Sequence, residues 1–130
     1  MRTYLLLPVL LVAACSGGSA GGGTSSSSLD TGCFTISEAV STFNDSQDAT
    51  KAGTATTADT MKAYASAADK LKTAALILPT GHLQDLTSTA ATALGRARVA
   101  LDGGGADDAD RAAVISALNE AAPLCKGHSG

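Results

Sequence analysis

Residues 58–78 read ADTMKAYASAADKLKTAALIL, and this stretch decides the fold. Its apolar positions recur at alternating intervals of three and four residues, which places them on one face of an α-helix. These positions are Met61, Tyr64, Ala68, Leu71, Ala75 and Leu78. Because this is also the spacing of a heptad seam, we expect the helix to pack lengthwise against other helices. We expect Thr57 to cap its start, and Pro79 with Gly81 to end it.

Three further alanine-rich segments show the same helical spacing. They cover residues 36–51, 82–102 and 108–124. Thr35 and Glu38 have the spacing of a capping box at the start of the first. Asp107 and Asp108 suit the start of the last, where carboxylates meet the positive end of the helix dipole. Pro123 predicts that this last helix stops about a turn early.

Four helices joined by short connections predict an all-α domain, an up-down-up-down four-helix bundle. Strand-like alternation is absent from the same region. In this topology the start of the first helix and the end of the fourth lie at the same end, which brings Cys33 close to Cys125. We therefore expect one disulfide between these two residues to close the bundle. Alanine fills many seam positions, so the bundle should be slim and modestly stable.

The first fifteen residues have the features of an export signal. Arg2 precedes an apolar run over residues 4–14, which is too short to span a bilayer as a helix. The run ends in Val12-Ala13-Ala14-Cys15, which resembles the lipobox of bacterial lipoproteins. The resemblance implies that the signal is cut before Cys15, that its thiol is lipidated and that the new amino terminus is acylated. It covers only the signal and implies nothing about the downstream domain.

The chain then divides into three parts: a signal peptide over 1–14, the lipidated cysteine with a linker over 15–32, and the helical domain over 33–130. Eleven of the 13 residues from Ser16 to Ser28 are Gly or Ser, a composition typical of a flexible tether. The odd count of three cysteines is thereby explained. One cysteine carries lipid, and two form the disulfide in an exported compartment that permits it.

Composition excludes several classes of function. A formal net charge of −3 and only four aromatic residues argue against nucleic-acid binding. The two histidines, His82 and His128, lack metal-ligand spacing, and no nucleophile motif occurs. We therefore predict no catalytic residue, metal or cofactor. Asp108 and Arg111 have the spacing of a solvated pair on a helix face.

The sequence thus predicts a non-enzymatic lipoprotein of the cell envelope. We expect a lipid anchor at Cys15 on the extracytoplasmic face of the cell membrane, an envelope protein as partner, and, from composition, an actinobacterial source. One feature favours an alternative: the seam of the first helix continues into a polar residue, Gln47, at the end away from the disulfide. A pocket of Tyr64, Met61 and Gln47 at that end would bind a small apolar ligand, or haem with Tyr64 or Met61 as axial ligand.

Overall fold

The computed structural model describes residues 27–128, and every regular element in that part of the chain is helical. The four α-helices are α2 (Ser27–Ala52), α3 (Thr57–Ile77), α4 (His82–Asp102) and α5 (Asp108–Ala121), and the 3-10 helix η4 (Ala122–Cys125) follows them. The predicted all-α class is confirmed for these residues. None of the helices described combines the length and apolarity needed to cross a membrane.

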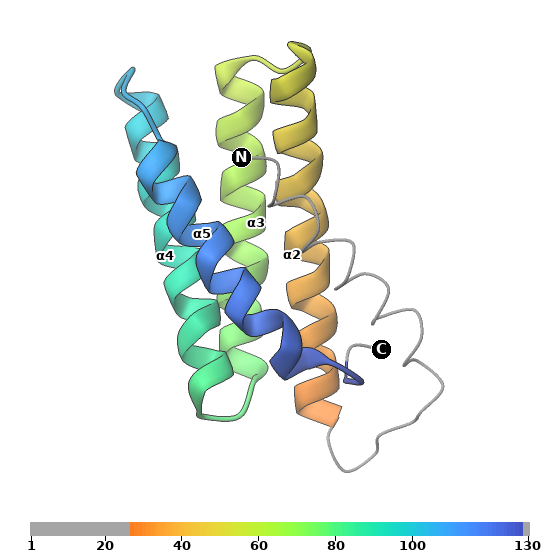
Figure 1. Cartoon of the computed structure of the whole chain (residues 1–130). Coiled ribbons are helices and arrows are strands. Elements are labelled where there is room, and N and C mark those ends of the chain that lie inside the picture. Colours follow the sequence, from red (N-terminus) through yellow and green to blue (C-terminus); the bar gives the residue numbers. More distant parts are fainter. Residues whose placement is uncertain (1–26, 129–130) are drawn as a thin grey trace.

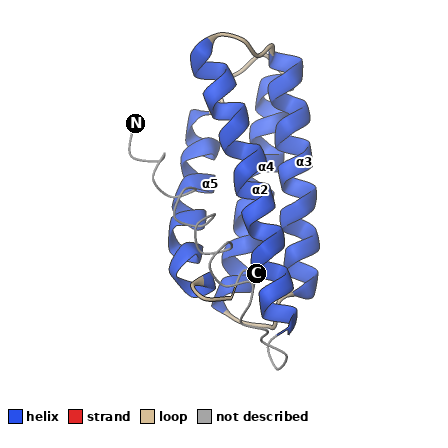
Figure 2. Cartoon of the chain, turned by 90° about the vertical axis from the view of Figure 1, so that its right-hand side faces the viewer, coloured by secondary structure: helices blue, strands red, loops and turns tan. Residues whose placement is uncertain are grey.

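Each helix packs against its neighbour in sequence: α2 on α3, α3 on α4 and α4 on α5. Figure 1 shows the α2–α3 and α4–α5 connections at one end and the α3–α4 turn at the other. The axes of α2, α3 and α4 run nearly side by side, whereas α5 crosses them obliquely (Figures 1 and 2). We call the end with the α3–α4 turn, residues 78–81, the disulfide end. The end with residues 53–56 and 103–107 is the far end.

The first helix begins nine residues earlier than residue 36, where the sequence predicts its start. Thr35 therefore lies inside α2, where its Oγ1 donates to the Thr31 carbonyl at 2.9 Å, and it forms no capping box. Packing explains the early start, because Cys33 and Ile36 are completely buried and Leu29 packs against the core. Residues 27–32, expected in the linker, are thus helical. The rest of that linker and the signal 1–14 lie outside the described residues.

The start of α3 is fixed by Thr56, not by Thr57 as predicted. Thr56 Oγ1 accepts a hydrogen bond from the Asp59 N–H at 3.1 Å. In return, Asp59 Oδ2 accepts one from the Thr56 N–H at 3.1 Å, which completes a capping box. The backbone N–H of Thr56, and then its hydroxyl, hold the pKa of Asp59 below its usual value. Asp59 is therefore the reason why the cap lies one residue earlier.

The other helix ends follow the sequence closely. α4 has the predicted bounds, and α5 ends at Ala121, where the chain enters η4 with Pro123 inside it. Gly53 stops α2 because it takes a left-handed conformation, with φ of 74°, that other residues rarely adopt. Its N–H donates to the Thr50 carbonyl at 3.1 Å.

The core contains few large side chains. The largest that are completely buried are Tyr64, Ile36, Leu71, Leu94, Val40 and Val114. On α3 the buried face is Thr60, Tyr64, Ala67, Ala68, Leu71 and Ala74, so the predicted seam positions Met61 and Ala75 lie at its margin, half-buried. The difference arises because α3 packs against both α2 and α4, which widens and turns the face that it must bury.

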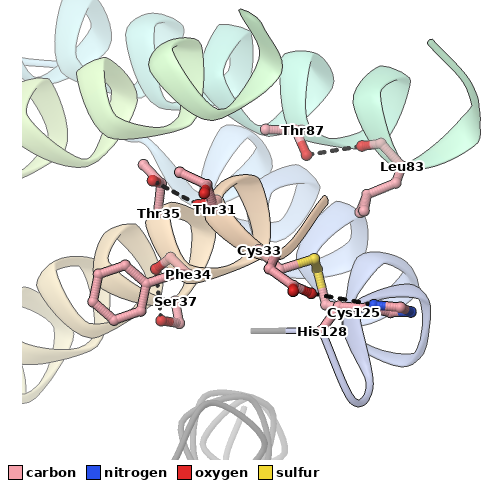
Figure 3. Close-up of a disulfide and its surroundings, with 10 residues drawn as sticks. Thr31, Cys33, Phe34, Thr35, Ser37, Leu83, Thr87, Cys125 and His128 are labelled. Carbon is pink, nitrogen blue, oxygen red and sulfur yellow. Dashed lines mark hydrogen bonds and ion pairs between the residues drawn. A yellow bond between two sulfur atoms is a disulfide. The ribbon is translucent and has the colours of Figure 1, made fainter. Parts of the chain in front are cut away.

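The two cysteines of the domain lie at disulfide distance, as the sequence predicts. The Sγ atoms of Cys33 and Cys125 are 2.09 Å apart and their Cα atoms 5.6 Å apart. Figure 3 shows the bond joining α2 to the end of the chain, below the turn of α4 that carries Leu83 and Thr87. Both cysteines are fully buried. Beside them, His128 Nδ1 lies 3.3 Å from Asp30 Oδ1.

Candidate functional site

At the far end a buried tyrosine links three helices. Tyr64 of α3 is only 1% exposed, and its ring centroid lies 5.9 Å from that of Phe43 on α2. Its hydroxyl donates to Asp107 Oδ2 at 2.7 Å, at the start of α5. The Tyr64 hydroxyl oxygen in turn accepts a hydrogen bond from Gln47 Nε2 of α2 at 3.1 Å. One hydroxyl thereby holds α2, α3 and α5 together.

The carboxylate of Asp107 is balanced by an arginine. Asp107 is 7% exposed and precedes α5, but its side chain caps no N–H of the helix. Its other oxygen, Oδ1, accepts a hydrogen bond from Arg111 Nη1 at 3.0 Å. Arg111 Nη2 also donates to the exposed Asp108 Oδ1 at 2.7 Å. A buried carboxylate needs such a partner, because an unpaired charge away from water is costly. We call Gln47, Tyr64, Asp107 and Arg111 the polar cluster.

The cluster changes how its members titrate. Burial, and then the hydrogen bond and negative charge of Asp107, raise the pKa of Tyr64 to about 12, against smaller opposite effects from Gln47 and Arg111. For Arg111, partial burial opposes the charged form, but Asp107, Tyr64 and Asp108 outweigh it and raise the pKa. At neutral pH Tyr64 is therefore a neutral phenol and Arg111 a charged guanidinium.

Two hollows flank the polar cluster. A cavity of about 140 Å³ is lined by Thr50, Ala55, Thr56, Thr57, Thr60, Tyr64, Leu101, Asp107 and Arg111. A groove of about 490 Å³ between α2 and α5 is lined by Gln47, Thr50, Lys51, Asp108, Arg111, Ala112 and Ile115. Thr50 and Arg111 border both. The groove lies between α2 and α5 because α5 packs mainly on α4, whereas η4 contacts α2 near the disulfide end.

Two of the three residues predicted to form a pocket come together. Gln47 and Tyr64 are hydrogen-bonded, whereas Met61 is half-buried and lines neither hollow. The Tyr64 hydroxyl donates a hydrogen bond to Asp107, so an axial bond from its oxygen to haem would require this contact to break. Among residues 27–128, no group of three or more His, Cys, Asp or Glu side chains is arranged to hold a metal. The predicted lipid site, Cys15, lies outside the residues that the structure describes.

Sequence reasoning missed Asp107 as a buried partner and treated Arg111 as part of a solvated pair. The exposed pair of Arg111 with Asp108 is present, but the same guanidinium also serves Asp107. The available signal was the four-residue spacing of Asp107 and Arg111, which puts both on one face of a helix. Nothing in the spacing shows that this face meets Tyr64, 43 residues earlier in the chain.

Comparisons with protein-family models, with curated proteins and with solved structures gave no match for this chain.

Proposed function

We propose that the chain is a cell-envelope lipoprotein, anchored through Cys15 to the extracytoplasmic face of the cell membrane. The division of its three cysteines carries the proposal. Cys33 and Cys125 are buried within bonding distance of each other, a pairing that persists in exported proteins. The remaining cysteine is the one in the lipobox-like sequence Val12-Ala13-Ala14-Cys15. Two or more acyl chains at this site would give a stable anchor.

The helical domain is, on this proposal, a non-enzymatic module for interaction with another envelope protein. Three of its polar groups bind each other: the buried Tyr64 hydroxyl donates to Asp107, which also accepts a hydrogen bond from the half-buried Arg111 guanidinium. A catalytic acid, base or nucleophile must reach a substrate at a useful pKa. Tyr64 is inaccessible and its pKa of about 12 keeps it protonated, which supports a structural role.

We further infer that the four α-helices form the up-down-up-down bundle expected from the sequence. Support comes from the short connections between helices that pack as sequence neighbours. In this arrangement the groove between α2 and α5 opens beside the far end, away from the anchored end of the chain. The groove combines the apolar surface of Ala112 and Ile115 with the guanidinium of Arg111. Interfaces commonly combine these chemistries.

Palmitate labelling in the native bacterium tests the anchor. We expect Cys15→Ala to abolish labelling and to release the protein from the membrane fraction, because the thiol is the attachment point. The matched control replaces Cys33 and Cys125 together by alanine, and this variant should still be labelled. Labelling that persists in Cys15→Ala would show that the lipobox interpretation is wrong.

Photo-crosslinking in the same membranes tests whether the helical domain binds another envelope protein. A photoreactive residue in place of Ala112, in the groove, should capture an envelope protein. One in place of the exposed Thr89 on α4 is the control. If both positions recover only the chain itself, the interaction part of the proposal loses its support while the anchor stands.

A further inference from the structure

Exposed apolar side chains gather at the disulfide end. Four large apolar residues of the described part are strongly exposed: Leu76 at 87%, Val99 at 62%, Phe34 at 47% and Leu124 at 40%. Three of them belong to elements that meet at the disulfide end, namely the early part of α2, the last turn of α3 and η4. The fourth, Val99, lies near the far end of α4. The apolar surface is therefore distributed unevenly along the domain.

The three residues lie at one level along the bundle. A Cβ atom at Gly32 of α2 would meet the side chain of Leu78, the residue after α3, so these two positions face each other. A short connection at the far end joins α2 and α3, so the two helices run in opposite directions (Figure 1). Phe34, two residues after Gly32, therefore lies level with Leu76, two residues before Leu78. Leu124 joins them because it precedes the cysteine bonded to Cys33. Figure 3 shows the Phe34 ring beside Cys33, directed away from the α4 turn of Leu83 and Thr87.

The charged residues are also distributed unevenly between the disulfide end and the far end. Residues 31–37, 73–81 and 121–125, which build the disulfide end, contain no charged side chain. At the far end, residues 45–59 and 102–111 together hold seven aspartates against Lys51 and Arg111, a balance of 2 minus 7, or −5. The charged residues around these segments are Asp30, Glu38, Lys72, Asp85, Glu120 and Lys126, a balance of 2 minus 4, or −2. An anionic bilayer would thus repel the far end more strongly than the disulfide end.

We propose that the disulfide end rests on the lipid bilayer, with Phe34, Leu76 and Leu124 in the headgroup layer. This inference depends on the lipid anchor of the proposed function. Cys15 precedes Ser27 by 27 minus 15, or 12, residues. Whatever their conformation, these residues reach at most about 40 Å, and they join the domain at its disulfide end. The anchor keeps that end at high local concentration near lipid, so three apolar side chains suffice to hold it.

Single-tryptophan reporters test the docking, because the chain contains no tryptophan. The full-length lipoprotein is prepared as Phe34→Trp, Leu76→Trp and Leu124→Trp, with Val99→Trp as the matched exposed control. Each is reconstituted in vesicles of phosphatidylglycerol and phosphatidylethanolamine, with and without brominated acyl chains. We expect the first three to show blue-shifted emission and loss of intensity with brominated lipid. Val99→Trp should emit as it does in water. Helical circular dichroism confirms that each variant is folded.

The outcomes separate this inference from the anchor. If the intact mass shows lipid on Cys15 but Phe34→Trp, Leu76→Trp and Leu124→Trp all emit as in water, like the control, the docking is refuted and the lipoprotein proposal stands. Equal quenching at all four positions refutes the preferred orientation. Blue shifts that appear in native membranes but not in pure lipid mean that a protein covers this surface instead, which also overturns the inference. A chain without lipid on Cys15 refutes both proposals.

Discussion

Tyr64 occupies an environment in which losing its proton is unfavourable. Ionisation would place a second negative charge 2.7 Å from the Asp107 carboxylate, on a side chain that is only 1% exposed. The pKa therefore rises from 10.0 to about 12 in the folded protein. Because Tyr64 has the higher pKa in the folded state, its contribution to the stability of the fold is fully present below pH 10. This contribution is lost as the pH rises through 12, since Tyr64 ionises first in the unfolded chain.

The alkaline titration of Tyr64 is the first prediction. In the chain that begins at Cys15, Tyr64 is the only tyrosine, so tyrosinate absorbance reports on it alone. We expect this absorbance to rise near pH 12 in the folded protein. The free energy of unfolding should fall by about 2 kcal/mol between pH 10 and 12. Tyr64→Phe measures the background from lysines, and an equal fall in this variant would contradict the assignment.

At this scale the sequence allowed part of the candidate site to be predicted. Gln47 was found because a polar residue interrupts an apolar seam, and Tyr64 because it continues one. Asp107 and Arg111 were recognised only as helix-start and surface residues. Their role depends on the distance between the start of α5 and the middle of α3. That distance is set by how the helices cross, and local spacing carries no information about it.

At the scale of elements, the accuracy of each predicted boundary follows from what fixes it. The bounds of α4 were predicted fully and those of α3 to within one residue, because Pro, Gly and capping residues mark them. The start of α2 has no such marker. Residues 27–35 are rich in Ser, Thr and Gly, which are poor helix formers, and they become helical through burial of Cys33 and contact of Leu29 with the core. Tertiary packing there outweighs propensity.

Two adjacent threonines at the start of α3 give the second prediction. We expect Thr56→Ala to lower the free energy of unfolding by about 1 kcal/mol, because the Asp59 N–H loses its acceptor. Thr57→Ala is the matched control and should change stability by less than about 0.5 kcal/mol, as at most exposed sites. Urea denaturation measures both. Equal losses would show that the capping box contributes nothing.

At the scale of the molecule, the last helical segment of the domain, α5 with η4, is tied to α2 at both ends. The Cys33–Cys125 pair joins them at the disulfide end, and Tyr64 bridges Gln47 of α2 and Asp107 before α5 at the far end. Between these contacts α5 packs mainly on α4. Both connections matter for stability because the core is rich in alanine, which buries little apolar surface.

Loss of the disulfide gives the third prediction. The bond closes a loop over a separation of 92 residues, and chain-entropy estimates give a stabilisation of about 4–5 kcal/mol for such a loop. That is a large share of the total of about 5–15 kcal/mol typical of a domain. The chain with Cys15→Ser should therefore unfold at much lower urea after reduction. Oxidised protein should resist alkylation at Cys33 and Cys125. Identical urea midpoints with and without reductant would contradict this.

If the chain is exported, as the proposed function holds, the packing of each helix on its sequence neighbour also bears on the order of folding events. Such a chain has low contact order, so its helices can assemble rapidly as they emerge. The covalent link between the first and last elements must wait for Cys125, and thiol oxidation is slow. Meanwhile Cys33 is free to react, and Cys15 lies only 33 minus 15, or 18, residues away. Lipidation of the Cys15 thiol, on the proposed function, removes the competing thiol and leaves Cys33 a single correct partner.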